Sequence, residues 1–414
     1  MGDSIAEAVA AGITPKLVRR FRDRYGDQAA AVILGIAAEQ PRAVEKFGPG
    51  VWMVTPKAIR QATDWVVAAY KAGLLGDAPV FDLCGGIGGD AIAFNRRGPV
   101  VTIDADPQVS AMAAANLVLA NRRGGGKHPA AAVCADVTRY PIPPDVAIHV
   151  DPDRRAEKRV VRPEDYQPNL AEVSRLVDRG PASIIKIAPA ALLENSPEGK
   201  SLAASGNRQW IGSDGSVREQ TLLFGDAILA GGVTPGGRSA VRLFRDGRVD
   251  RFAIDSGQAA QIDEVDRSLP TSVDPPRFLF DLDPAVRAAG LSAWFATTRR
   301  WVALGGPSGF FGAGELPTDR SLVQCFESLW AGPADVKQVK RVTRDRNLWV
   351  DSVKVRVTGH DPEKWLKSLR EDRSTRKNRS PGDAGRSIPS DQPVVTLLIG
   401  RHHGGVYAVI AKRL

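Results

Sequence analysis

The chain has 414 residues, which is too long for one compact core and predicts two or three domains. Its 43% hydrophobic and 25% charged residues are typical of globular proteins, and no apolar run approaches the roughly 18 residues of a membrane-spanning helix. The first residues lack the basic start and apolar core of a secretory signal. Three cysteines and five histidines show no disulfide or metal-ligand spacing, so we expect a cytoplasmic protein without a bound metal.

The formal net charge of +9 is concentrated at the end of the chain. From Asp335 to Leu414 there are 18 Lys and Arg residues against nine Asp and Glu residues, so this segment carries the whole excess. A basic C-terminal module on a neutral body predicts a polyanionic partner, most simply a nucleic acid. Charge alone leaves an ordinary solvated surface as the alternative.

Residues 1–75 are predicted to form an N-terminal helical region. Apolar residues recur at helical spacing up to Gly35. Thr55 and Pro56 then predict the start of one longer helix, which ends at Gly73. Trp65 lies on the apolar face of that helix, where an aromatic residue is more often part of the core than a cover for a ligand.

Residues 76–254 alternate between short apolar strands and helices. Four successive strands end near Asp82, Asp104, Asp136 and Asp151, and a fifth contains Lys186. This alternation predicts an α/β fold with a doubly wound, Rossmann-like parallel sheet. Two Asp-Gly turns then predict hairpins, so the sheet is expected to finish with antiparallel strands.

The last part of the chain is predicted to form a smaller α+β domain. Residues 255–277 are polar and Pro-rich and predict a linker, and residues 278–414 form the basic domain that follows it. A helix is expected after Asp283, which is placed to cap it, and a hairpin closes the chain. The polar segment 372–391 predicts a disordered loop.

The segment "VFDLCGGIGGD", residues 80–90, places a glycine-rich loop directly after the first strand. Gly86 and Gly88 let the main chain approach a ligand at the start of the next helix. The glycines do not follow the GxGxxG pattern of dinucleotide folds, and Asp82 and Asp90 flank them. Two carboxylates suit the cationic sulfonium and ammonium groups of S-adenosylmethionine (SAM) and repel a pyrophosphate. We therefore favour SAM, and expect Cys84 to contact it as well.

The aspartates at the strand ends are expected to line one site, because the carboxyl ends of parallel strands meet at one edge of the sheet. Asp104 is placed to accept hydrogen bonds from both ribose hydroxyls of the cofactor. Asp136 is placed to accept one from the adenine amino group. Asp151 follows the fourth strand, where the substrate is expected to react.

The motifs "DLCGGIGGDA", "TIDADP", "CAD" and "DPDRR" resemble those of class I SAM-dependent methyltransferases. From about residue 40 onward the chain resembles a bacterial group with a C-terminal THUMP-like domain, distantly similar to trimethylguanosine synthases. Members often have Cys where this chain has Gly85, a difference from which we expect little effect on binding. The resemblance implies RNA as a partner and a substrate base or other nucleophile near Asp151. It implies SAM binding by Asp82, Gly86, Gly88, Asp104 and Asp136.

The segment after the fourth strand departs from the pattern of nucleic-acid amino methyltransferases, which is Asp or Asn, two prolines and an aromatic residue. Asp151 and Pro152 are present, but Asp153 and Arg154 replace the second proline and the aromatic residue. Either Arg154 stacks on a base or clamps a phosphate, or it pairs with Asp153 and the site takes a different nucleophile. We favour the first, and assign catalytic roles to Asp151, Pro152 and Arg154. Lys186 is placed to bind a phosphate, to neutralise Asp151, or only to support the structure.

The sequence thus predicts a SAM-dependent methyltransferase that acts on RNA, at a base or an exocyclic amine. Three alternatives stay open. The first is a noncatalytic RNA-binding protein that retains a SAM pocket. The second is a small-molecule methyltransferase whose basic tail only solubilises it, and the third is an NAD(P)-dependent oxidoreductase.

Overall fold

The computed structural model describes residues 1–122, 124, 126, 128–154, 165–177, 180–371 and 392–414. It divides into two compact units, each built around one large sheet. Met1–Val249 and Ala253–Ala259 form the first unit, and Asp250–Phe252 and Ala260–Leu414 form the second. Within the described residues, no helix is both long and apolar enough to cross a membrane.

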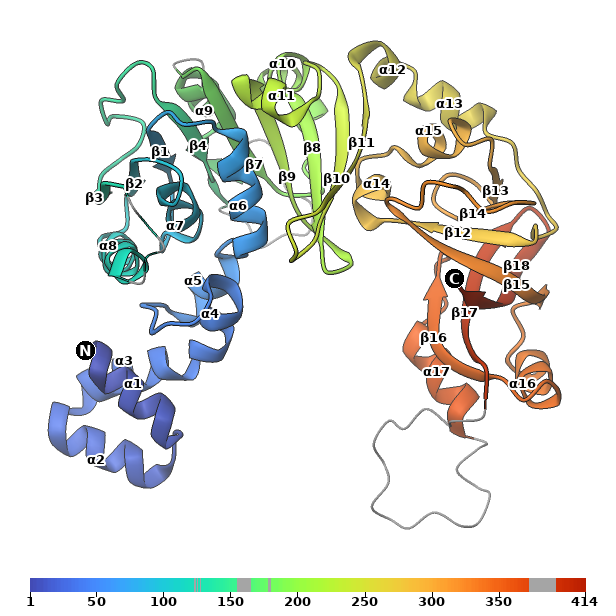
Figure 1. Ribbon diagram of the computed structural model, residues 1–414, viewed down its shortest axis with the longest axis horizontal. Helices are drawn as coiled ribbons and strands as arrows, with labels where there is room; N and C mark the ends of the chain where they lie inside the picture. The colour runs from blue at the N-terminus through green and yellow to red at the C-terminus, as the bar shows by residue number, and fades with distance from the viewer. Residues whose placement is uncertain (123, 125, 127, 155–164, 178–179, 372–391) are drawn as a thin grey trace. The chain divides into compact units, whose positions relative to one another are not determined.

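The first unit begins with four helices, as the helical spacing of its apolar residues predicts (Figure 1). Ile5, Phe21 and Ile33 come from three different helices and are buried in one apolar cluster. Thr14 caps the second helix by accepting a hydrogen bond from the amide of Leu17, at 3.2 Å. The four helices are α1 (Gly2–Ala11), α2 (Pro15–Tyr25), α3 (Asp27–Ala38) and α4 (Gln40–Phe47).

The prediction of one long helix after Thr55 is wrong, because the chain forms two helices with a break at Thr63. Thr55 caps α5 (Pro56–Gln61), as expected, and Asp64 then caps α6 (Trp65–Leu74) by accepting a hydrogen bond from Val66. Lys46 stabilises the break, since its ammonium donates to the carbonyl oxygens of Arg60 and Ala62. The break leaves Thr63 outside both helices, where its side chain is free to face the sheet.

The sheet of the first unit has the strand order β3-β2-β1-β4-β7-β9-β8-β10-β11. The first five strands in this order run parallel, which confirms the predicted doubly wound sheet. β9 is antiparallel to both β7 and β8, so the hairpin predicted at the first Asp-Gly turn is confirmed, whereas β10 is parallel to β8. The strands are β1 (Val80–Leu83), β2 (Val100–Asp104), β3 (Ala130–Cys134), β4 (Ala147–Val150), β7 (Ala182–Ile187), β8 (Asn207–Ser213), β9 (Ser216–Gly225), β10 (Arg238–Leu243) and β11 (Val249–Ile254).

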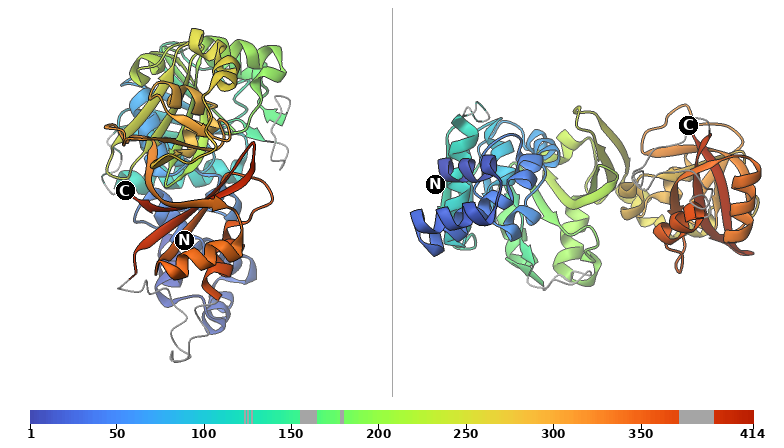
Figure 2. Two further views of the ribbon diagram at one scale, coloured as in Figure 1. Left: turned by 90° about the vertical axis from the view of Figure 1, so that its right-hand side faces the viewer. Right: turned by 90° about the horizontal axis from the view of Figure 1, so that it is seen from below.

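Helices cover both faces of this sheet (Figures 1 and 2). Alternate strand residues point to opposite faces, so neighbours on one strand enter different apolar clusters. Ile184 of β7 joins the cluster that contains α6 and α7, whereas Ile185 joins the one that contains α9 and α10. The remaining elements are α7 (Gly89–Asn95), α8 (Pro107–Arg122), α9 (Leu170–Val177), η2 (Leu193–Asn195), α10 (Pro197–Ser205), α11 (Asp226–Gly231) and the short pair β5 (Asp153–Arg154) and β6 (Tyr166–Gln167).

The second unit contains a seven-stranded sheet in the order β13-β14-β12-β15-β18-β17-β16. Its pairs are antiparallel except for β16 and β17, and the predicted closing hairpin of β17 and β18 is confirmed. The strands are β12 (Phe278–Leu282), β13 (Val302–Leu304), β14 (Phe310–Ala313), β15 (Val323–Pro333), β16 (Trp349–Val355), β17 (Val394–His402) and β18 (Gly405–Arg413).

Within the described residues, five helices, α13 to α17, accompany these strands, whereas α12 lies at the end of the first unit. Asp283 caps α14 as predicted, by accepting a hydrogen bond from Ala285 at 2.9 Å. The segment 255–277, predicted as a linker, contains α12 and α13. The predicted disordered loop, residues 372–391, lies outside the described residues. The helices are α12 (Ser256–Ala260), α13 (Ile262–Ser268), α14 (Pro284–Ala288), α15 (Ser292–Thr297), α16 (Val336–Asp345) and α17 (Pro362–Glu371).

One buried amide joins the segment after α4 to the glycine loop. Asn116 on α8 is fully buried. Its Oδ1 accepts from the amide of Met53 at 2.7 Å, and its Nδ2 donates to the carbonyl oxygens of Met53 at 2.9 Å and of Ile87 at 3.0 Å. The position of the glycine loop therefore depends on the segment that precedes α5.

Asn116→Ala is expected to destabilise this junction by roughly 1–3 kcal/mol, because the Met53 and Ile87 backbone groups lose their buried partner. Hydrogen exchange of the peptide that contains residues 51–54 should be faster in the variant. Val118→Ala, at an exposed position of the same helix, is the control and should leave that exchange unchanged. Equal exchange in Asn116→Ala and the unmodified protein would show that the amide does not hold the junction.

Candidate functional site

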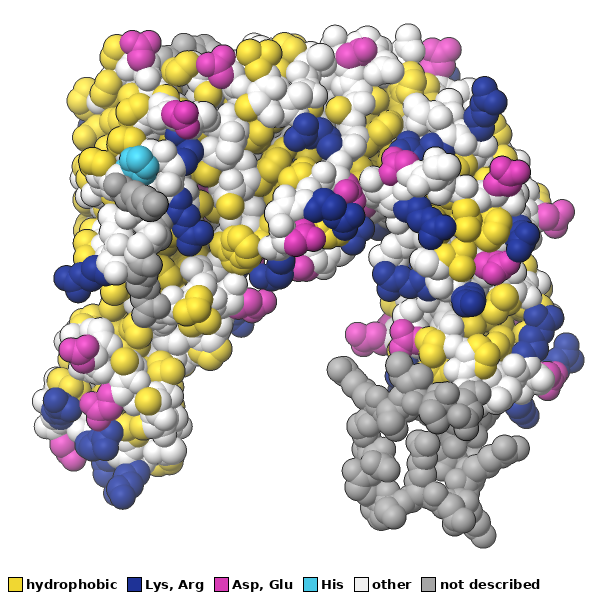
Figure 3. Space-filling model, in the orientation of Figure 1, with side chains coloured by type: hydrophobic (Ala, Val, Ile, Leu, Met, Phe, Trp, Pro, Cys, Tyr) yellow, Lys and Arg dark blue, Asp and Glu magenta, His cyan; other side chains and the backbone are white. Residues whose placement is uncertain are grey.

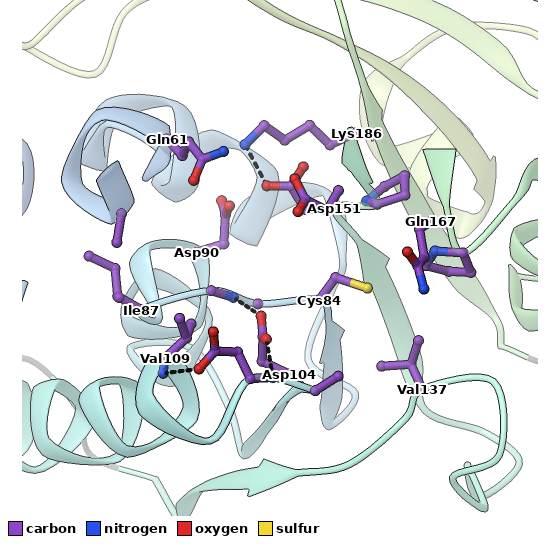
Figure 4. A pocket seen from close by; sticks show the side chains of 18 of the residues that line it. Gln61, Cys84, Ile87, Asp90, Asp104, Val109, Val137, Asp151, Gln167 and Lys186 are labelled. Atoms are coloured by element: carbon purple, nitrogen blue, oxygen red, sulfur yellow. Dashed lines mark hydrogen bonds and ion pairs between the residues drawn. The ribbon is translucent and has the colours of Figure 1, made fainter. Parts of the chain in front are cut away.

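A cavity of about 1010 Å³ opens at the carboxyl ends of the parallel strands in the first unit, where α/β sheets bind their ligands (Figure 4). Its described lining comes from several separate segments. They are residues 55–63, 84–90, 104–112, 135–139, 151–153 and 166–172, together with Lys186, although not every residue in these ranges reaches the cavity. The strand-end positions of the sequence analysis thus largely converge on one cavity.

The glycine loop forms one wall of the cavity. Gly86 lines it and has a φ of 57°, a left-handed conformation that glycine adopts without strain. Gly88 also has a positive φ, of 85°, but it is not among the residues that line the cavity. A Cβ at Gly88 would lie 3.6 Å from Ala113 of α8, so this glycine allows two helices to pack closely. The structure thus gives Gly88 a role in loop conformation, and its contact with the cofactor stays a prediction.

Gly85 is constrained from beneath the loop. A Cβ at this position would overlap the hydroxyl of Thr102, which donates a hydrogen bond to Asp82 at 3.1 Å. In this chain a side chain at Gly85 would have to displace that buried hydrogen bond, and the small effect of a cysteine here on binding stays a prediction.

Asp82 does not line the cavity, contrary to the prediction of a direct contact with the cofactor. Its side chain is fully buried, and its Oδ1 lies 2.7 Å from Nδ1 of His149. Burial raises the pKa of Asp82, against the opposing effect of the His149 hydrogen bond. Asp82 lies under Gly85 and supports the loop rather than the ligand.

Asp104 lines the cavity and also holds the loop. Its Oδ2 accepts a hydrogen bond from the amide of Gly86 at 3.0 Å, and its Oδ1 accepts one from Asp106 at 3.0 Å (Figure 4). Burial raises the pKa of the Asp104 carboxyl. Cys84 lines the same wall, and burial raises the pKa of its thiol well above the ordinary value, so the thiol is neutral and a poor nucleophile.

Asp136 lies at the rim of the cavity, with an exposed side chain. Its Oδ1 accepts hydrogen bonds from the Thr138 hydroxyl at 2.7 Å and from the Thr138 amide at 2.9 Å. These bonds lower the pKa of Asp136. The carboxylate is thus ionised and held in place beside Val137, whose apolar side chain also lines the cavity.

Asp151 and Lys186 form the polar end of the cavity, facing Gln61 (Figure 4). The Lys186 ammonium lies 2.7 Å from Oδ2 of Asp151, so Lys186 does neutralise this carboxylate. Oδ1 of Asp151 has no hydrogen-bond partner among the residues described here. Pro152 is buried and lines the cavity beside it. For Arg154 only the backbone is described, as part of β5, so its predicted stacking or clamping role lies outside what the structure describes.

Beneath the cavity a fully buried lysine of α6 contacts side chains from three other elements, α7, β9 and β4. The Lys71 ammonium on α6 lies 2.9 Å from Oδ1 of Asp90, 3.0 Å from Oε1 of Glu219 and 3.2 Å from Nε2 of His149. Burial alone would lower the pKa of Lys71, but Asp90 and Glu219 raise it further than burial lowers it. Burial likewise opposes ionisation of Asp90, but Lys71, His149 and Lys186 together outweigh it and lower the pKa of that carboxyl. The lysine is therefore a permanent cation.

Thr63 connects this buried cluster to the Asp151 end of the cavity. Its hydroxyl donates to Oδ2 of Asp90 at 2.7 Å and accepts from Lys186 at 3.2 Å. Asp90 lines the cavity as predicted, yet both of its oxygens already have protein partners. One continuous polar network thus runs from Asp82 beneath the glycine loop to Asp151.

The sequence analysis missed Thr63, Lys71, His149 and Glu219. Two of them carry a signal, because Lys71 interrupts the apolar helix "WVVAAYKAGL" and His149 interrupts the apolar strand "VAIHV". An ionisable residue in a segment that is otherwise buried needs a buried partner. The identity of that partner cannot be read from spacing, since Lys71 and Glu219 are far apart along the chain.

Comparisons with known proteins agree with this geometry. Two proteins of Mycobacterium tuberculosis, from strains CDC 1551 and H37Rv, are each 28% identical to the chain over 362 residues, which covers 84% of this chain and 91% of the relative. Each is named an uncharacterized SAM-dependent methyltransferase. The enzyme class and the cofactor predicted from the sequence are confirmed. No family model matches the chain.

A crystal structure from Porphyromonas gingivalis W83, provisionally assigned as a methyltransferase, has the same fold. It superposes with a TM-score of 0.69 and 16% sequence identity, over 98% of this chain and 94% of that one. The similarity therefore extends over both units of this methyltransferase, and it concerns the fold alone.

Lys71→Met is expected to lower the free energy of unfolding by about 3–5 kcal/mol, because it leaves Asp90 and Glu219 buried without a cation. Adding Glu219→Gln removes one of the two uncompensated charges and should recover part of the loss. Urea unfolding of the single and double variants measures both effects. Lys16→Met, at an exposed position of α2, is the control. A single variant as stable as the unmodified protein would show that the buried ion pairs contribute little.

Proposed function

We propose that this methyltransferase binds SAM along the glycine loop and transfers its methyl group to a nitrogen or oxygen nucleophile of RNA at Asp151. SAM, when bound, supplies a methyl group made electrophilic by the sulfonium. The lining of the cavity fits a cationic cofactor, because among its described residues seven are acidic and only Lys57, Arg139 and Lys186 are basic. This balance disfavours the pyrophosphate of a dinucleotide, which needs cationic or amide donors.

Asp104, Gly86 and Asp136 are proposed to hold the cofactor. Asp104 reaches the cavity from the end of β2 with a carboxylate that Gly86 and Asp106 have already oriented. That carboxylate offers its remaining lone pairs to the two ribose hydroxyls. Asp136 is proposed to accept a hydrogen bond from the adenine amino group, with Val137 against the ring.

Replacing Asp104 by Asn is expected to weaken SAM binding by roughly 1–3 kcal/mol and to remove a pH dependence. In the unmodified protein, affinity should fall as the pH is lowered, because the protonated carboxyl accepts hydrogen bonds from the ribose less well. Burial raises the pKa of Asp104, so the fall should begin at a higher pH than for an exposed aspartate.

Calorimetric titration of SAM at a series of pH values measures this effect. Asp23→Asn, at an exposed position of α2, is the control and should bind SAM with the pH dependence of the unmodified protein. If Asp104→Asn retains the full pH dependence, another group holds the ribose.

Asp151 is proposed to orient the nucleophile. Lys186 fixes Oδ2 of this carboxylate, which leaves Oδ1 to accept a hydrogen bond from an N–H or O–H of the substrate. Methyl transfer is an in-line displacement, so positioning of the nucleophile is the main contribution that a protein can make. When the nucleophile loses its proton, Oδ1 is the acceptor placed to take it.

The RNA substrate is proposed from the charge of the chain. The last 80 residues carry the whole positive excess, which is the observation that supports a polyanionic partner. The THUMP-like character of the second unit stays a prediction of the sequence. A noncatalytic RNA-binding protein is the second candidate. The described part of the cavity lining favours this candidate, because it offers no free aromatic ring on which a base could stack. Among the described lining residues Tyr166 is the one aromatic residue, and it is buried. Its hydroxyl accepts a hydrogen bond from the amide of Ala188.

Asp151→Ala should retain SAM affinity and lose methyl transfer by about 10²–10⁴-fold, the usual contribution of a positioned acid or base. Labelled SAM and RNA from a strain that lacks the gene provide the assay. Glu198→Ala, exposed on α10, is the control and should transfer at the unmodified rate. SAM binding without transfer by the unmodified protein would support the noncatalytic candidate, and full transfer by Asp151→Ala would exclude Asp151 from the reaction.

A further inference from the structure

The helix α16 of the second unit presents three cations in a row. Lys337, Arg341 and Arg344 stand at positions i, i+4 and i+7, which places them on one side of the helix, about one turn apart. All three are exposed, and Lys and Arg side chains gather over α16 in Figure 3. We call these three residues the α16 stripe.

The opposite side of α16 is fixed against the sheet. Val339 and Thr343 are buried, and Val336 and Val342 pack against the same apolar cluster of the second unit. The helix is therefore held rigidly, and the stripe is presented at a defined place. Because the apolar side is already covered, the helix has no free apolar face with which to enter a membrane surface.

Within the described part of the chain, the charges of the stripe have no acidic partner. Among the described residues, no carboxylate lies within ion-pair distance of Lys337, Arg341 or Arg344. Several other cations of the second unit do have acidic partners. Arg277 pairs with Glu327 at 3.0 Å and Arg299 pairs with Asp319 at 3.1 Å.

Three further cations of the second unit have an acidic partner, the buried carboxylate of Asp281. Arg287, Lys354 and Arg356 all pair with Asp281, at 2.6–2.9 Å. Those three cations are turned toward a buried acid, whereas the stripe faces solvent. The stripe therefore offers uncompensated positive charge at regular spacing, which is the property that binds a chain of phosphates.

We propose that the α16 stripe binds the phosphate backbone of the RNA substrate. This inference rests on the proposed function and names the surface through which the second unit takes part in it. Lys337 and the two arginines contact successive phosphates, with the arginines able to donate two hydrogen bonds to one phosphate. Contacts of this kind hold the strand without reading its sequence.

The test compares two triple variants of the full chain that lose the same charge. The first is Lys337→Gln, Arg341→Gln and Arg344→Gln. The matched control is Arg267→Gln, Arg320→Gln and Lys412→Gln, three exposed cations elsewhere in the second unit. Binding of a fluorescently labelled single-stranded RNA of mixed sequence is measured by anisotropy at several salt concentrations.

The slope of log affinity against log salt should become shallower by about 2 in the stripe variant, since each phosphate contact in single-stranded RNA contributes about 0.7. The control variant should keep the unmodified slope. SAM affinity should be unchanged in both, which verifies that the first unit is intact. An equal loss in the two variants would overturn the inference, because it would show a general effect of net charge.

Two further outcomes separate this inference from the proposed function. If the stripe variant binds RNA as the unmodified protein does, and the unmodified protein methylates RNA, the α16 stripe is not the RNA-binding surface. The proposed function is then left intact. Absence of RNA binding and RNA methylation by the unmodified protein overturns the proposed function. Binding of the unmodified protein to phosphatidylserine vesicles, lost in the stripe variant while RNA binding is kept, would assign the stripe to a membrane surface.

Discussion

The cavity of the first unit depends on one buried cation. Lys71 has no exposure to solvent, and a lysine in that position is tolerated only because Asp90 and Glu219 approach it from two different elements. The acids need the lysine for the same reason. The lysine and the two acids therefore hold one another in place. As a result, the elements that carry them cannot shift independently, and these elements are α6, α7 and β9.

This mutual dependence holds the Asp151 end of the cavity and the glycine loop at a fixed separation. His149 links Lys71 to Asp82 under the glycine loop, and Thr63 links Asp90 to Lys186 beside Asp151. An in-line displacement tolerates little error in the distance between its two partners. A polar network in a dry interior is well suited to that task, because breaking one hydrogen bond in it leaves a costly unsatisfied group.

The sequence predicts the fold and the position of the site from local patterns. Strand-end aspartates and the glycine loop are local features, and Asp104 and Asp151 lie on the cavity as their positions require. Asp82 has the same local pattern, but the side chain of a residue inside a strand points to one face of the sheet and is buried there. The helix break at Thr63 and the Lys71 cluster depend on partners from distant parts of the chain, and spacing contains no information about them.

The cavity lining is mainly acidic, whereas the last 80 residues of the chain are basic. A cationic cofactor favours an acidic cavity, and the same acidic cavity repels the phosphates of RNA. A methyltransferase that uses both must therefore bind the polyanion through a surface that is chemically separate from the cavity. In the proposed function, Lys186 reduces this conflict beside Asp151, because it cancels the charge of that carboxylate while leaving Oδ1 as an acceptor. The proposed function would therefore account for a chain whose first 334 residues are neutral and whose last 80 residues are basic.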